Sequence, residues 1–207
     1  MIGIFGGTFD PVHYGHLRSA LEVKDIFGLR EVRLVPSAQP PHRQQPVATA
    51  LMRLDMLQLA IEHQPGLCID ACELERAGPS YMVDTLKLLQ LEFNAEPLVL
   101  FIGSDAFNQL TTWYQWQQLF DTAHVVVMTR PGYKIEQLDA FFTARLTNDR
   151  TELAQNSAGK LYFQQVSQLD ISATSIRNMI AEQQNPGFLL PDKVIAYIRQ
   201  HQLYLRH

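Results

Sequence analysis

The chain has 207 residues, which suits one large α/β domain or one domain with a small appendage. Hydrophobic residues make up 46% and charged residues 18%, so the composition supports a buried core and excludes a largely disordered chain. The formal net charge is −4, from 17 basic and 21 acidic residues, and without a basic excess we expect no nucleic-acid partner.

Short apolar runs typical of β-strands alternate with stretches of helical periodicity along most of the chain. The predicted strands are Met1–Phe5, Glu31–Val35, Leu67–Ala71, Leu98–Ile102, Val125–Met128 and Leu161–Gln165. The predicted helices between them are Gly15–Phe27, Ala48–His63, Tyr81–Phe93, Gln115–Asp121 and Ile135–Arg145. This alternation predicts an α/β fold, a Rossmann-like doubly wound parallel sheet with helices on both faces.

After residue 165 the pattern changes to helices alone. The predicted helices of this part are Thr174–Glu182 and Pro191–Gln202. We expect one domain over residues 1–207, in which 1–170 form the α/β core and 171–207 a small helical part on the carboxyl edge of the sheet. The polar segment Thr147–Lys160 predicts a surface loop, and Leu51 is expected on the apolar face of the second helix.

No stretch of the sequence indicates a secretion signal or a membrane span. The apolar runs Pro97–Ile102 and His124–Met128 have the length of a strand and are too short to cross a bilayer. Cys68 and Cys72 lie in one predicted strand, where four residues span roughly 13 Å, too far for a disulfide. We therefore expect two free thiols, no membrane partner and a cytoplasmic location.

The first predicted strand runs directly into a glycine-rich segment with two histidines, Gly6–His16. Glycines between a strand and a helix let the backbone approach a ligand and expose N–H groups at the positive end of the helix dipole, where phosphate binds. His13 and His16 are three residues apart, so both rings should project from one face of the first turn, with Gly15 leaving room for the ligand. Each feature alone is usually structural, but their conjunction predicts a phosphate site. The spacing differs from Gly-x-Gly-x-x-Gly, which counts against a dehydrogenase.

The second motif, Ile171–Arg177, again predicts a loop that enters a helix. Ser172 or Thr174 is expected to cap this helix, and hydroxyls and free N–H groups there suit phosphate oxygens. Arg177 lies one turn further, where its guanidinium would reach the same oxygens. A serine or threonine cap followed by an arginine is, taken alone, usually structural.

The two motifs together resemble the nucleotidyltransferase superfamily with the His-x-Gly-His motif. Within it, the chain is similar to the bacterial nicotinate mononucleotide adenylyltransferases, which make deamido-NAD in NAD biosynthesis. The resemblance also includes Pro40–Arg43, Pro79–Tyr81, Gly103–Asp105, Thr112–Tyr114 and Arg130–Gly132. Two positions depart from the family pattern: Ala173 stands where a serine is usual, and Met82 where threonine is frequent.

The resemblance implies that the phosphate of nicotinate mononucleotide attacks the α-phosphorus of ATP and that pyrophosphate leaves. A phosphate monoester has its second pKa near about 6, so it is already an anionic nucleophile and no general base is needed. The site has to align two polyanions and neutralise the charge that develops on pyrophosphate. Mg²⁺ is expected to arrive with ATP, held by the phosphates, and we expect no dedicated metal site in the protein.

The resemblance also implies a role for each site residue. The predicted catalytic residues are His13, His16 and Arg177. The predicted ATP-binding residues are Gly6, Gly7, Thr8, His13, His16, Gly103, Asp105, Ser172, Thr174 and Arg177. The predicted mononucleotide-binding residues are Thr8, Phe9, Arg43, Tyr81, Thr85, Trp113 and Tyr114, with the indole of Trp113 stacked on the pyridine ring. Asp105 as a helix N-cap and Arg43 as a solvated loop cation remain open alternatives.

Two rival functions also stay open. A phosphopantetheine adenylyltransferase or a cytidylyltransferase would share the fold and the chemistry, although the Trp113-Tyr114 pair and the loop Pro40–Arg43 favour a pyridine mononucleotide. A non-catalytic nucleotide sensor is the other rival. The histidine pair and Arg177 argue against it, because a sensor has no need to stabilise departing pyrophosphate.

Overall fold

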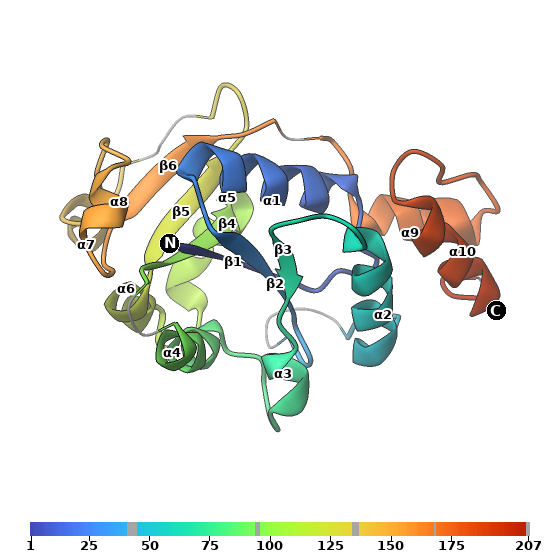
Figure 1. The fold of residues 1–207 in the computed structure, drawn as a ribbon. Coiled ribbons are helices and arrows are strands. Elements are labelled where there is room, and N and C mark those ends of the chain that lie inside the picture. The colour runs from blue at the N-terminus through green and yellow to red at the C-terminus, as the bar shows by residue number, and fades with distance from the viewer. Residues whose placement is uncertain (41–44, 94–95, 134–136, 168, 206–207) are drawn as a thin grey trace.

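The structure is a computed structural model and describes residues 1–40, 45–93, 96–133, 137–167 and 169–205. One parallel sheet has the strand order β3-β2-β1-β4-β5-β6. The strands are β1 Ile2–Gly7, β2 Glu31–Pro36, β3 Leu67–Ile69, β4 Leu98–Gly103, β5 His124–Thr129 and β6 Leu161–Gln165. The chain runs outward from β1 to β3 and then returns to the other side of β1, so the topological switch lies between β1 and β4 (Figure 1).

Helices cover both faces of this sheet (Figure 1). The longer helices are α1 Tyr14–Phe27, α2 Ala50–Ile61, α4 Met82–Glu92, α9 Ala173–Ala181 and α10 Asp192–Gln200. The shorter ones are α3 Cys72–Glu75, α5 Ser104–Phe107, α6 Leu119–Thr122, α7 Ala140–Thr143 and α8 Glu152–Gln155, with 3-10 turns η1 Leu110–Thr112 and η2 Trp116–Gln118. Successive side chains of β4 alternate between two cores: Val99 packs with α1 and α2, and Leu100 with α4 and α6.

The doubly wound parallel sheet is confirmed, and each predicted strand is present. In place of the helix predicted over Gln115–Asp121, the chain forms η2 and then α6. The helix predicted over Ile135–Arg145 lies partly outside the described residues, and its described part contains only the single turn α7. The surface loop predicted over Thr147–Lys160 is wrong in part, because α8 buries Leu153 completely and that one apolar anchor orders the segment.

Two details of the sequence analysis are corrected in α2 and β3. Leu51 is 67% exposed, whereas Arg53 is only 1% exposed, because the guanidinium of Arg53 finds buried carbonyl acceptors. The strand expected to reach Ala71 ends at Ile69, and Cys72 begins α3 instead. Both cysteines are free, as expected, but the spacing argument based on one continuous strand was wrong.

The helices after residue 170 pack on the α1 side of the sheet. Ile176 of α9 and Val194 of α10 belong to the same buried cluster as Leu17 of α1, and α10 packs against α2. The N–H of Tyr14 donates to the carbonyl of Leu189 at 2.9 Å. We therefore propose that residues 171–207 are a helical part of a single domain rather than a separate unit. In the described part of the chain, no helix has both the length and the apolar character needed to cross a bilayer.

Candidate active site

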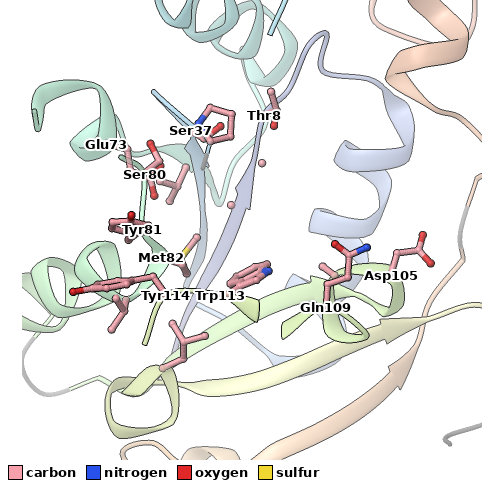
Figure 2. Close-up of a pocket in the computed structure, with 17 residues that line it drawn as sticks. Thr8, Ser37, Glu73, Ser80, Tyr81, Met82, Asp105, Gln109, Trp113 and Tyr114 are labelled. Atoms are coloured by element: carbon pink, nitrogen blue, oxygen red, sulfur yellow. The ribbon is translucent and has the colours of Figure 1, made fainter. Parts of the chain in front are cut away.

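A cavity of about 240 Å³ opens at the carboxyl ends of β1 and β2, beside the switch point (Figure 2). Its lining includes Gly6, Gly7, Thr8, Ser37, Glu73, Tyr81, Met82, Asp105, Gln109, Trp113 and Tyr114. These residues come from the ends of β1 and β2, the starts of α3 and α4, and the segment after β4. Ligands of open α/β sheets bind at this place, so position and lining agree on one candidate site.

The paired glycines at the end of β1 permit close packing at the cavity. A Cβ atom on Gly6 would lie 2.5 Å from the terminal methyl group of Met82, and one on Gly7 would lie 2.8 Å from the ring of Phe9. Met82, a departure from the family pattern, therefore covers Gly6 with an apolar side chain. Phe9 is 1% exposed and its ring centroid lies 5.1 Å from that of His16. Its ring belongs to the core and is absent from the cavity lining.

The two histidines of the first motif lie ring on ring at the start of α1. Their ring centroids are 3.7 Å apart and their planes are inclined by 25°. The main-chain N–H of His13, which is the N-cap, donates to Nδ1 of His16 at 3.3 Å. A neutral imidazole with an accepting Nδ1 carries its proton on Nε2. His16 is thereby fixed as an N–H donor at Nε2.

His13 is 5% exposed, and burial lowers the pKa of its imidazole to about 4. The ring is therefore neutral at pH 7. Its Nδ1 is buried and makes no hydrogen bond within the described residues. A Cβ atom on Gly15 would lie 2.9 Å from this nitrogen. The space beside Gly15 is occupied by the His13 ring, which corrects the expectation that it leaves room for a ligand.

The second motif begins α9 as predicted. Ser172 is the N-cap, and its hydroxyl accepts from the N–H of Ser175 at 3.1 Å. Arg177 donates from Nη1 to the main-chain carbonyl of Asp10 at 2.8 Å and from Nη2 to the hydroxyl of Thr174 at 3.3 Å. The arginine of the second motif thus binds the loop of the first motif directly. The helix starts of α1 and α9 form one continuous region.

Gly103 is the N-cap of α5, and Asp105 is the second residue of that short helix. The alternative interpretation of Asp105 as the N-cap is therefore wrong. Asp105 is exposed and lines the cavity. A Cβ atom on Gly103 would meet nothing within 4 Å among the described atoms, so open space adjoins this strand end. The carboxylate of Asp105 is therefore accessible to a ligand that lies at the carboxyl end of β4.

Aromatic side chains form one wall of the cavity. Trp113 is half-buried and Tyr114 is 47% exposed, and Figure 2 shows both beside Met82 at the cavity. The ring of Tyr81 stacks on that of Tyr114 with centroids 4.3 Å apart. The main-chain N–H of Tyr114 makes no hydrogen bond to any residue that the structure describes. An aromatic face and an N–H donor thus occur at neighbouring positions.

Thr85 is fully buried in α4 and is absent from the cavity lining. Its hydroxyl donates to Oε1 of Glu73 at 2.6 Å and lies 3.3 Å from the carbonyl of Tyr81. Glu73, which the sequence analysis missed, is 3% exposed and lines the cavity, and burial raises the pKa of its carboxyl group. Thr85 can therefore act on this cavity only through Glu73 or Tyr81.

Arg43 and Thr8 are also among the predicted mononucleotide-binding residues. Arg43 lies outside the described residues. The carbonyl of Thr8 accepts from Nη1 of the buried Arg53 at 2.6 Å, and Thr8 lines the cavity beside Gly7. Among the residues that the structure describes, no group of three or more His, Cys, Asp or Glu side chains is placed to hold a metal ion.

A doubly wound sheet with a glycine-rich first loop, joined to a second helix start, belongs to the class of α/β proteins that bind nucleotide phosphates. The family model described as cytidylyltransferase-like matches residues 4–179. A probable nicotinate-nucleotide adenylyltransferase of Methylococcus capsulatus is 49% identical over 100% of both chains. One of Pseudomonas putida strain W619 is 45% identical, over 98% of this chain and 94% of that one. The chain belongs to the cytidylyltransferase-like family and, within it, to the nicotinate-nucleotide adenylyltransferases.

Solved structures show the same fold at low sequence identity. The nicotinic acid mononucleotide adenylyltransferase of Plasmodium falciparum complexed with NaAD has a TM-score of 0.73 at 18% identity, covering 98% of this chain and 96% of that one. A putative nicotinate-nucleotide adenylyltransferase of Vibrio parahaemolyticus has a TM-score of 0.66 at 14% identity, covering 100% and 96%. At these identities the likeness concerns the fold alone.

Proposed function

We propose that the protein transfers the adenylyl group of ATP to nicotinate mononucleotide, giving deamido-NAD and pyrophosphate in NAD biosynthesis. One observation carries this proposal. Arg177 of α9 donates to the carbonyl of Asp10 and so joins the starts of α1 and α9, both suited to phosphate, beside an aromatic cavity. The names of full-length relatives at 41–49% identity point to the same reaction.

ATP is proposed to lie across the starts of α1 and α9. The Nε2–H of His16 donates to the α-phosphate, where negative charge is redistributed as the new bond forms. Arg177, Ser172 and Thr174 hold the β- and γ-phosphates, because a helix start with an arginine one turn on offers both N–H groups and charge. Asp105 accepts from the ribose hydroxyls. Mg²⁺ enters with ATP, held by the phosphates, and when bound it neutralises part of their charge.

His13 contributes to this site as a neutral group. Its Nδ1 is buried against Gly15, so only the other ring nitrogen, Nε2, is left to donate to a phosphate oxygen. Because the pKa of His13 is about 4, its ring carries no positive charge at neutral pH, with or without ATP.

Nicotinate mononucleotide is proposed to occupy the aromatic cavity. Trp113 stacks on the pyridine ring, and the N–H of Tyr114 donates to the ring carboxylate. Thr8 and the glycines before it line the seam where the mononucleotide phosphate meets ATP. Tyr81 bounds the cavity by stacking on Tyr114. Phe9 lies in the core and supports the loop after β1 from there.

We place the reaction in the cytoplasm, which suits the free thiols Cys68 and Cys72. The decisive experiment measures pyrophosphate release from ATP with nicotinate mononucleotide, nicotinamide mononucleotide and phosphopantetheine as separate acceptors, and from CTP with each. Release with ATP and a pyridine mononucleotide supports the proposal. Release with phosphopantetheine or CTP alone, or ATP binding with no release in any pairing, would replace it with one of the rival functions.

A further inference from the structure

Asp10 carries a buried carboxylate at the centre of the first motif. Its side chain is 6% exposed, and both oxygens are occupied by protein donors. Oδ2 accepts from the N–H of Val47 at 2.9 Å. Oδ1 accepts from the N–H of Ala48 at 3.2 Å and from the hydroxyl of Tyr204 at 2.7 Å. The shortest of these hydrogen bonds comes from a residue 194 positions away, which follows α10.

Arg177 lies next to this carboxylate without pairing closely with it. Its Nη1 donates to the main-chain carbonyl of Asp10 at 2.8 Å but lies 3.9 Å from Oδ2. The Arg177 side chain is 27% exposed, so it is not enclosed in the core as Asp10 is. A carboxylate whose lone pairs are filled by N–H and O–H donors attracts a neighbouring guanidinium less than one that lacks a donor.

We propose that Tyr204 is a positioning residue for adenylyl transfer, which fills Oδ1 of Asp10 and so leaves Arg177 turned toward the nucleotide phosphates. The proposal rests on the role given to Arg177 under Proposed function. Without the Tyr204 hydroxyl, a buried anionic carboxylate loses its shortest hydrogen bond. Arg177, whose Nη1 lies 3.9 Å from Oδ2 of the same carboxylate, can then turn toward it, whereas the guanidinium of Arg53 is held by three carbonyl groups. The guanidinium of Arg177 would close on Asp10 and withdraw from the leaving pyrophosphate.

The setting of Tyr204 fits a residue held for this contact. It is 7% exposed and belongs to the core cluster shared by α1 and α2. Its backbone has φ 65°, the left-handed region that costs a residue with a Cβ roughly 1 kcal/mol or more. Burial and the neighbouring Asp10 carboxylate raise the pKa of its hydroxyl, so the group remains a donor at every working pH.

The test is Tyr204→Phe, which removes one hydroxyl and keeps the ring. We expect kcat/KM with ATP and nicotinate mononucleotide to fall about tenfold, because Arg177 turns toward Asp10 and its charge-assisted contact with the phosphates weakens. The matched control is Tyr197→Phe. The hydroxyl of Tyr197 donates to Asp55 at 2.8 Å and also ties the C-terminal part to the rest, but on the exposed side of α10 and α2. Tyr197→Phe should retain wild-type kcat/KM.

A double-mutant cycle distinguishes positioning from general loosening of the fold. In an Arg177→Lys background, Tyr204→Phe should cost less than twofold, because the group through which it acts is already altered. Thermal unfolding midpoints of both tyrosine variants are measured alongside; a structural role alone would lower the midpoint without the selective loss of kcat/KM.

Wild-type turnover in Tyr204→Phe overturns the proposal, as does an equal loss in both arginine backgrounds. An equal loss in Tyr197→Phe and Tyr204→Phe overturns it too. Failure of the proposed function looks different, because the wild-type protein itself would then release no pyrophosphate. In that case the ATP affinity of wild type and Tyr204→Phe, measured by calorimetry, decides the inference: equal affinities refute it.

Discussion

The main-chain N–H of His13 donates to Nδ1 of His16 while the two rings stack with centroids 3.7 Å apart. One hydrogen bond thus sets the proton of His16 on Nε2 and places that ring against a buried neighbour. The arrangement makes one histidine a donor of fixed direction and keeps the other neutral. The two histidines of the motif are therefore unequal, and replacing them should have different consequences.

Replacement of His16 by alanine should lower kcat by about 10²-fold or more, because the contact strengthens as charge develops at the α-phosphate. Steady-state turnover with ATP and nicotinate mononucleotide measures the loss, and circular dichroism checks the fold. His63→Ala, at an exposed position after α2, is the control and should retain wild-type turnover. Near wild-type kcat in His16→Ala would remove this residue from the reacting centre.

His13 should make the stability of the protein depend on pH. Its pKa is about 4 in the folded protein and 6.5 in a model compound. Below pH 6.5 the unfolded chain takes up a proton that the folded chain refuses until about pH 4, so stability falls as the pH falls through this window. Between pH 7.5 and 5 this histidine alone accounts for a loss of about 2 kcal/mol.

Urea unfolding of wild type and His13→Gln at both pH values isolates this contribution, because other titrating groups are common to the two proteins. The free energy of unfolding of the variant should change less with pH. His63→Gln serves as the control and should follow wild type. Parallel pH dependence in wild type and His13→Gln would show that His13 is protonated normally in the folded state.

The acid substrate should be preferred over the amide. The N–H of Tyr114 has no partner in the described part of the chain, and a carboxylate accepts from such a donor with either oxygen. A carboxamide accepts with its one oxygen but carries no charge, so a charge-assisted hydrogen bond worth about 1.5–3 kcal/mol becomes a weaker neutral one. We expect kcat/KM for nicotinate mononucleotide to exceed that for nicotinamide mononucleotide about 10²-fold at one ATP and Mg²⁺ concentration. Equal values would refute the assignment of this donor and leave adenylyl transfer untouched.

Replacement of Thr85 by valine should lower the stability of the protein, although the two side chains have nearly the same shape. Thr85→Val keeps the shape but removes the hydroxyl that donates to the buried Glu73, so an acceptor is left unsatisfied at a cost of about 1–3 kcal/mol. Thr112→Val is the control, because its hydroxyl donates to the carbonyl of Gln109 on the exposed surface at 2.7 Å. Chemical denaturation compares the two variants. A loss no larger in Thr85→Val than in Thr112→Val would contradict the buried pair.

Strong local patterns account for what the sequence predicts correctly. Most strands are runs of apolar residues, and residue type limits the cap of α9 to Ser172 or Thr174, of which the structure has Ser172. The position of Trp113 and Tyr114 at the cavity also agrees with the sequence, because two neighbouring aromatic residues in a polar setting cannot both lie in the core. These inferences depend on near neighbours in the chain, which a single sequence contains.

The buried charges could not be predicted, because their partners are distant in the chain. Arg53 is oriented inward by the carbonyls of Thr8 and Ala48, and an arginine without such acceptors would lie on the surface. Glu73 follows the third strand in a stretch whose helical turn is too short to show periodicity. Leu153 likewise is a single buried apolar residue in a polar segment, and one residue is too few to show a helical periodicity.

Arg53 makes hydrogen bonds to more than one loop. Its guanidinium donates to the carbonyls of Thr8, Ala38 and Ala48, while Asp10 holds the N–H of Ala48 from the other side. The described segments around Thr8, Ala38 and Ala48 are therefore held by one cation. If one of these segments opened alone, the buried guanidinium of Arg53 would lose an acceptor. The segments therefore behave as one cooperative unit of local unfolding. Their amide protons will exchange with solvent at a common rate, set by the release of Arg53 rather than by each loop.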